Sequence, residues 1–206
     1  MPIIAIVGNK GGAGKTTLSV NLAAGISNQS SIAVIDADPQ GSSLQWRAIA
    51  GDNVHFPVYA ATFSLKQQAE SYSSKNDFVL IDCPPSVKSP QSISVLEFAD
   101  IAIIPVQPSP MDLWATVHIE RAISEARETN PELEALLVIN QLESRTTLSK
   151  LVREVLNEIA LPVADTAIRR RAIYRNSALE GKSVYGVGKR GADAVEELNS
   201  LIQEVV

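Results

Sequence analysis

Five short apolar runs recur along the chain, and the segments between them repeat apolar residues every three or four positions. The runs occupy residues 3–7, 32–35, 78–81, 101–106 and 135–139. Runs of this length are typical of buried strands, whereas a membrane span needs about 20 apolar residues. Between the first two runs, Leu18, Leu22 and Ile26 have helical spacing. This alternation predicts an α/β three-layer sandwich in which helices cover both faces of a mostly parallel central sheet.

Composition narrows the class of protein. The chain has 206 residues, of which 45% are hydrophobic, enough for one large core. It shows no linker, repeat or low-complexity stretch, so we expect residues 1–206 to form a single domain. Cys83 is the only cysteine, which excludes a disulfide framework and a cysteine-built metal site within one chain. The first apolar run is too short for a signal peptide, and we expect a cytoplasmic protein.

Residues 9–17 follow the first apolar run and read Asn-Lys-Gly-Gly-Ala-Gly-Lys-Thr-Thr; we call this segment the phosphate loop. Glycines let backbone N–H groups surround an anion, and the helix that follows directs its N-terminus at the phosphates. Lys15 is expected to reach the β- and γ-phosphates, and the Thr16 hydroxyl to hold Mg²⁺. Asn9 stands where the usual pattern has glycine, a mild departure because Asn tolerates left-handed angles. The residues expected to bind the nucleotide here are Gly11, Gly12, Ala13, Gly14, Lys15, Thr16 and Thr17.

A second lysine, Lys10, precedes Lys15 by five positions and is not needed to bind phosphates within one chain. The string Lys-Gly-Gly-Ala-Gly-Lys-Thr-Thr resembles the deviant Walker A motif of the ParA/MinD family of ATPases. The resemblance implies a P-loop NTPase fold and an ATP-dependent homodimer in which Lys10 crosses to the partner's nucleotide. The alternative is an ordinary solvated lysine on a loop.

Acidic residues follow two of the apolar runs. One run ends in Asp36-Ala37-Asp38-Pro39-Gln40, and another ends in Asp82-Cys83-Pro84-Pro85. Ligands of open α/β sheets bind at the carboxyl ends of the strands, so these carboxylates are expected to converge on the phosphate loop. The resemblance implies that Asp82 contacts Mg²⁺ through water, that Asp36 supports the metal, and that Asp38 orients or deprotonates the attacking water. A single aspartate of this kind would often be a helix cap instead. We therefore expect Lys10, Lys15 and Asp38 to be catalytic, and Thr16, Asp36 and Asp82 to serve the metal.

The run at 135–139 ends in Asn140-Gln141-Leu142-Glu143. GTPases recognise guanine with Asn-Lys-x-Asp, and the lysine and aspartate are missing here. The family resemblance favours ATP, with Asn140 at the adenine. A strand-end turn residue is the alternative for Asn140.

Three prolines fall within residues 104–112, which fixes an extended path between a strand and a helix. The segment resembles the proline-rich stretch of short ParA proteins, which lies near nucleotide and dimer contacts. We accordingly assign Pro105 to nucleotide binding and expect Asp112 to cap the following helix.

Charge is distributed unevenly along the chain. The net charge is −5, but residues 145–190 contain ten basic and four acidic residues, a local net charge of +6. Such a patch can bind the phosphate backbone of double-stranded DNA without reading bases, and a dimer would double it. A solvated basic surface is the alternative. The residues that we expect to bind DNA are Arg169, Arg170, Arg171, Arg175, Lys182, Lys189 and Arg190.

The last 16 residues carry four acidic side chains and no lysine or arginine. Leu198, Leu201, Ile202 and Val205 have helical spacing. An acidic helix would be repelled by anionic lipid, so we expect it to pack on the core and expect no membrane attachment.

The resemblance extends over the whole chain and implies a ParA-type ATPase on the nucleoid. It would bind DNA nonspecifically and position cargo, with hydrolysis stimulated by a small cargo-adaptor partner. Short ParA proteins of plasmid partition and carboxysome-positioning ATPases both match, so the sequence leaves the cargo open. Two other classes remain as alternatives: a MinD-like regulator on a membrane surface, and a small phosphoryl-transfer enzyme such as dethiobiotin synthetase.

Overall fold

The computed structural model describes residues 2–143, 152, 154–156 and 158–206. Within these residues seven strands form one sheet in the order β3-β2-β4-β1-β5-β6-β7, and every neighbouring pair is parallel. The strands are β1 (Ile3–Ile6), β2 (Ile32–Asp36), β3 (Val58–Ala60), β4 (Phe78–Asp82), β5 (Ile101–Val106), β6 (Glu134–Leu142) and β7 (Ile168–Arg169).

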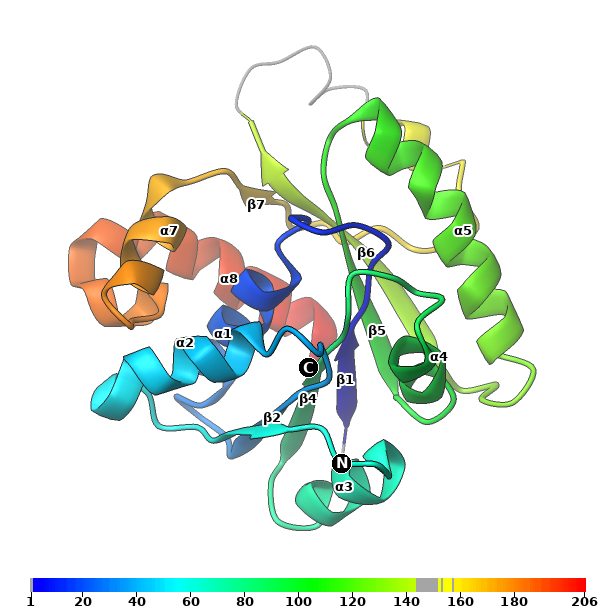
Figure 1. The fold of residues 1–206 in the computed structure, drawn as a ribbon. Coiled ribbons are helices and arrows are strands. Elements are labelled where there is room, and N and C mark those ends of the chain that lie inside the picture. The colour runs from blue at the N-terminus through cyan, green and yellow to red at the C-terminus, as the bar shows by residue number, and fades with distance from the viewer. Residues whose placement is uncertain (1, 144–151, 153, 157) are drawn as a thin grey trace.

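Helices cover both faces of this sheet, which confirms the predicted three-layer architecture (Figure 1). One layer contains α1 (Lys15–Ile26), α2 (Ser42–Ala50), α7 (Ala172–Leu179) and α8 (Ala192–Val205), and the other contains α3 (Leu65–Ser73), α4 (Pro90–Leu96) and α5 (Pro110–Ala126). Two 3₁₀ segments, η1 (Gly51–Asn53) and η2 (Val184–Gly191), also occur among the described residues.

Strand β1 illustrates how the apolar runs build two cores. Ile4 and Ile6 pack into the core under α1 and α8, whereas Ile3 and Ala5 pack into the core under α4 and α5. Successive side chains of a strand point to opposite faces, so a strand buried on both faces is apolar throughout.

Two strands were not predicted, β3 and β7. They have three and two residues, lie at the edges of the sheet and lack the long apolar run that marks a central strand.

The C-terminal helix α8 packs on the core as predicted, because Leu198 and Leu201 are fully buried beside α1. Among the described residues, no helix is both long enough and apolar enough to cross a membrane.

Candidate functional site

The phosphate loop joins β1 to α1 at the carboxyl edge of the sheet. Gly12 and Gly14 have φ angles of 80° and 89°, which glycine adopts at little cost. A Cβ atom on Gly14 would lie 2.4 Å from Nδ2 of Asn140, so this close approach also needs glycine. Helix α1 begins at Lys15, and its free N–H groups favour an anion at this end.

Side-chain amides from the neighbouring strand ends hold the carbonyl groups of the loop. Nδ2 of Asn140 donates to the Ala13 carbonyl at 2.7 Å. Nε2 of Gln107 and Nε2 of Gln141 both donate to the Gly12 carbonyl, at 2.8 and 3.0 Å. Neither glutamine was selected from the sequence. Asn140 is buried beneath the loop, and its contact with adenine stays a prediction.

The two lysines of the loop point in different directions. Lys15 is only 7% exposed, and its Nζ donates to the Lys10 carbonyl at 3.2 Å. Burial lowers the pKa of Lys15, while the charges of Asp82 and Asp38 oppose that shift. The Lys10 side chain is 50% exposed, and its Nζ contacts Oδ2 of Asp112 at 3.1 Å.

Asp112 does not cap α5, contrary to the prediction. The Oγ of Ser109 accepts a hydrogen bond from the Asp112 N–H, and Pro110 occupies the first helical position. This is the favoured arrangement of a hydroxyl at the cap followed by proline. The Asp112 carboxylate instead accepts hydrogen bonds from the Ser109 hydroxyl and from Lys10. Pro105 lies near Lys10 and Asp112, on the side of the loop that faces α5.

Asp82 ends β4 and is almost fully buried. Its Oδ1 accepts from the Ser19 hydroxyl at 3.0 Å, and its Oδ2 accepts from the Ser43 hydroxyl at 2.5 Å. Burial raises the pKa of the Asp82 carboxyl and nearby Asp36 adds to this, while hydrogen bonds from Ser43, Thr16 and Ser19 oppose it. Ser19 and Ser43 were not predicted as partners of Asp82, because nothing in the local sequence marks a serine as a partner of a distant aspartate.

Asp36 ends β2 and lies directly opposite Asp82 in the sheet register. Its carboxylate accepts from the N–H groups of Asp38 and Leu44, at 3.1 and 2.9 Å. Burial is the main cause of its raised pKa. Asp38 is partly exposed, and its Oδ1 accepts from the Gln40 N–H at 2.9 Å. The three aspartates thus lie at the same edge of the sheet, as expected.

The donors at this edge suit magnesium. In the described part of the chain, no three His, Cys, Asp or Glu side chains are grouped to hold a metal ion. Mg²⁺ usually keeps several waters and takes only one or two carboxylates together with substrate phosphates. Both oxygens of Asp82 already accept hydroxyl hydrogen bonds, which fits contact with a metal through water.

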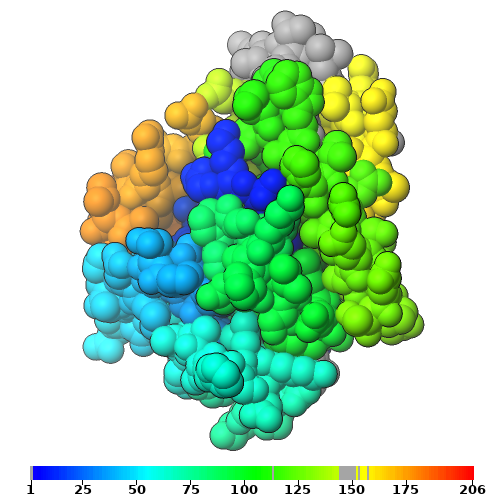
Figure 2. Space-filling view, turned by 45° about the vertical axis from the view of Figure 1, so that its right-hand side comes forward, coloured from blue at the N-terminus to red at the C-terminus, as the bar shows by residue number. Residues whose placement is uncertain are grey.

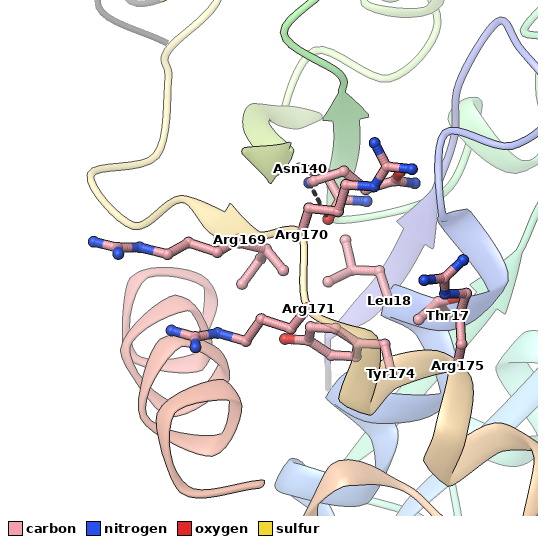
Figure 3. A pocket seen from close by; sticks show the side chains of 10 residues that line it. Thr17, Leu18, Asn140, Arg169, Arg170, Arg171, Tyr174 and Arg175 are labelled. Atoms are coloured by element: carbon pink, nitrogen blue, oxygen red, sulfur yellow. Dashed lines mark hydrogen bonds between the residues drawn. The ribbon is translucent and has the colours of Figure 1, made fainter. Parts of the chain in front are cut away.

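A pocket of about 220 Å³ opens beside the start of α1 (Figure 3). Its apolar surface comes from Leu18, Ile168 and Tyr174, and amide groups come from Asn140 and Gln141. Burial raises the pKa of the Tyr174 hydroxyl, which therefore stays protonated. Sites that enclose a whole ligand usually measure about 300–1,000 Å³, so this pocket is large enough for only part of such a ligand. The remaining lining residues are Thr17, Arg169, Arg170, Arg171 and Arg175.

Most of the arginines and lysines expected to bind DNA are paired with carboxylates. Arg171 contacts Glu197 at 2.7 Å and Asp193 at 2.8 Å, both on α8. Arg169 also approaches Glu197, at 3.6 Å, and Arg170 contacts Glu143 at 2.5 Å.

A further acidic residue, Glu180, pairs with two of the remaining basic side chains. It lies 3.1 Å from Lys182 and 3.8 Å from Arg190. Arg175 and Lys189 form no ion pair with any described residue. Three further basic residues of the window, Arg145, Lys150 and Arg153, lie outside the described residues. The positive patch is therefore weaker in space than the count along the sequence suggests.

Two acidic side chains of α8 also bind backbone N–H groups of the segment before α7, although Asp193, Glu196 and Glu204 are exposed. Glu204 accepts from the N–H groups of Asp165 and Thr166, each at 2.8 Å. Together with Glu197, it attaches the segment before α7 to the C-terminal helix.

Comparisons with known proteins identify the family of this chain. Residues 4–184 match the family model described as the CobQ/CobB/MinD/ParA nucleotide binding domain. The maintenance of carboxysome distribution protein A of Halothiobacillus neapolitanus is 37% identical over 206 residues, which cover 98% of this chain and 95% of that protein. The sporulation initiation inhibitor protein Soj of Bacillus subtilis is 26% identical, over 95% of this chain and 96% of that protein.

Solved structures show the same fold. Cobyrinic acid a,c-diamide synthase of Mycobacterium smegmatis, with bound ADP and magnesium, has a TM-score of 0.74 and 25% identity, and covers 86% of this chain and 92% of that chain. McdA of Cyanothece without nucleotide has a TM-score of 0.78 and 18% identity. The match spans 99% of this chain and 98% of the McdA chain.

Proposed function

The chain belongs to the CobQ/CobB/MinD/ParA family of nucleotide-binding domains, and on that premise we propose that it is a ParA-type positioning ATPase. Residues 1–206 would act as one ATPase domain that binds ATP with Mg²⁺ and forms a sandwich dimer. The dimer would bind double-stranded DNA nonspecifically on the nucleoid. A small cargo adaptor would then stimulate hydrolysis and release the dimer from DNA.

The observation that carries this proposal is the difference between the surroundings of the two lysines. Lys15 is buried and donates to its own loop, where it can neutralise phosphate charge, whereas the Lys10 side chain is half exposed beside Asp112. Figure 2 shows the phosphate loop, in dark blue, at the surface between the orange segment around α7 and the green segment of α5. A lysine on an open face can reach the nucleotide of a second copy. There it would stabilise charge that develops during phosphoryl transfer.

The remaining roles follow from the position of each group. The phosphates would bind the backbone N–H groups of residues 11–17, and the adenine would enter the pocket beside Thr17 and Asn140. Mg²⁺ would be held by the Thr16 hydroxyl and, through water, by Asp82, with Asp36 behind it. When bound, it neutralises charge on the transferred phosphoryl group. Asp38 is partly exposed at the same edge and would orient the attacking water.

The cargo is proposed from the names of similar proteins and their sequence identity. A relative named for carboxysome distribution matches nearly the whole chain at 37% identity, whereas the relatives named for chromosome partitioning, a ParA and a Soj, match at 23% and 27%. A second relative with the same name matches at 27% identity. We therefore favour a protein organelle such as the carboxysome over a plasmid or a chromosome, on the 37% relative alone.

A DNA-binding titration tests the switch. Fluorescence anisotropy of a labelled duplex of arbitrary sequence would be followed with MgATP, with MgADP and without nucleotide. Only MgATP should give tight binding, because the dimer doubles the basic patch. Lys15→Ala, which removes the phosphate partner, should bind weakly in all three conditions. Equal affinity of the wild-type protein in the three conditions would refute the proposal.

A further inference from the structure

Two glutamines from separate strands share one acceptor in the phosphate loop. Gln107 follows β5 and Gln141 lies near the end of β6, and their Nε2 atoms are 2.8 and 3.0 Å from the Gly12 carbonyl oxygen. The next carbonyl, that of Ala13, accepts from Asn140 at 2.7 Å. Three amide donors therefore hold two successive peptide groups of the loop.

These contacts set the direction of the loop's N–H groups. A trans peptide is planar, so its carbonyl oxygen and the N–H of the next residue point to opposite sides. When the Gly12 and Ala13 carbonyls are held toward the strand ends, the N–H groups of Ala13 and Gly14 point away from them, into the loop. Glycine populates many backbone angles, so without these contacts the Gly12 peptide would turn easily.

The backbone of β6 is distorted in a way that makes this contact possible. Consecutive residues of a regular strand point to opposite faces. Here Asn140 and Gln141 both reach the phosphate loop, because the pairing of β6 with β7 shifts register between Asn140 and Leu142. Gln141 has a φ of 58° and is the one non-glycine residue with a positive φ in the described ranges. Such angles are unfavourable and persist where surrounding contacts enforce them, often at functional sites.

We propose that Gln107 and Gln141 are positioning residues that pre-orient the N–H donors of the phosphate loop for the nucleotide phosphates. This inference rests on the proposed nucleotide site. A glutamine amide performs this role without adding charge, so Lys15 remains the cation directed at the phosphates. Each glutamine still holds the Gly12 carbonyl when the other is removed, so their effects are coupled through one shared atom.

The first experiment measures the dissociation constant of MgADP by isothermal titration calorimetry for Gln107→Ala, Gln141→Ala and the double variant. Gln68→Ala is the matched control, because its Nε2 also donates to a backbone carbonyl, that of Ala60, away from the site. Each single variant should weaken MgADP binding about three- to tenfold, the range expected for one hydrogen bond. In the double variant, the fold-increase of the MgADP dissociation constant should exceed the product of the fold-increases in the two single variants. The melting temperature without nucleotide should change no more than in the control.

A second variant separates positioning from general stability. In Gln107→Glu, a protonated carboxyl can donate to the Gly12 carbonyl, whereas the ionised form cannot and repels it. The ratio of its MgADP dissociation constant to that of Gln107→Ala should therefore fall as the pH is lowered from about 8 to about 5, through the rising protonated fraction of the carboxyl. A double variant that binds MgADP as tightly as wild type, or a ratio that does not vary with pH, would overturn this inference. Either result would leave the proposed function standing. A wild-type protein that binds no MgADP would overturn this inference together with the proposed function.

Discussion

The contact between Lys10 and Asp112 makes a quantitative prediction about dimer formation. If Lys10 crosses to the nucleotide of a second chain, it must first leave the Asp112 carboxylate, 3.1 Å away in its own chain. Asp112→Asn keeps the size of the side chain and an oxygen that can accept from Ser109, but it removes the charge that holds Lys10. The variant should therefore dimerise more readily in the presence of ATP.

The magnitude follows from the exposure of the pair. The Lys10 side chain is half exposed, so the contact contributes about 1 kcal/mol, the upper end for exposed pairs. The Asp112 side chain is only 7% exposed, but the Ser109 hydroxyl continues to donate to it after Lys10 leaves. This hydrogen bond limits the free-energy cost of leaving the buried carboxylate without Lys10. A symmetric dimer breaks two such pairs, about 2 kcal/mol in total. That corresponds to a roughly 30-fold lower dimer dissociation constant for the variant, because about 1.4 kcal/mol is a factor of ten.

Sedimentation velocity with a non-hydrolysable ATP analogue measures this dissociation constant directly. Glu125→Gln on the same helix is the matched control, because it removes an exposed pair with Arg121 that lies outside the site. The dimer dissociation constant of Glu125→Gln should equal that of the wild type. If Asp112→Asn dimerises no more tightly than the wild type, Lys10 does not leave Asp112 on dimer formation and its role across the interface is wrong.

Three further predictions concern the aspartates and the basic patch. Asp38→Ala should bind MgATP and dimerise normally but release phosphate roughly a hundredfold more slowly; normal turnover would remove Asp38 from the chemistry. Asp82→Asn should raise the melting temperature of the nucleotide-free protein at pH 8, and this gain should shrink as the pH falls. The sign follows from the pKa of the Asp82 carboxyl, which burial raises. The carboxyl therefore contributes stability at low pH, and this contribution is lost as the pH rises through the folded-state pKa. A gain in melting temperature that is independent of pH would contradict this. Arg171→Ala should lower the free energy of unfolding by about 2 kcal/mol, because it leaves Glu197 without its main partner. Arg175→Ala should leave the free energy of unfolding unchanged and weaken ATP-dependent DNA binding in a gel shift. The reverse pattern would exclude Arg175 as a DNA contact.

The central strands and the site edge were predictable because they depend on local pattern. A strand buried on both faces must be a continuous apolar run, and parallel strands bring their carboxyl ends to one edge. Asp36 and Asp82 could therefore be placed together from sequence, and they are paired in the sheet register.

The contacts that depend on tertiary packing could not be found in this way. Ser43 and Asp82 are 39 positions apart, and nothing in either neighbourhood indicates their hydrogen bond. The charge count over residues 145–190 overstates the local positive charge for the same reason: Glu197 lies outside that window in sequence but against Arg171 in space. The cap of α5 was misplaced by three residues because Asp112 and Ser109 are both good capping residues, and only the backbone path decides between them.

The attachment of α8 connects the last helix of the fold to the proposed nucleotide site. Glu204 holds the N–H groups of Asp165 and Thr166, and Glu197 holds Arg171, which lines the pocket beside the phosphate loop. Helix α8 therefore supports one wall of that pocket from behind, and a change that shifts the helix is expected to move Arg171 with it.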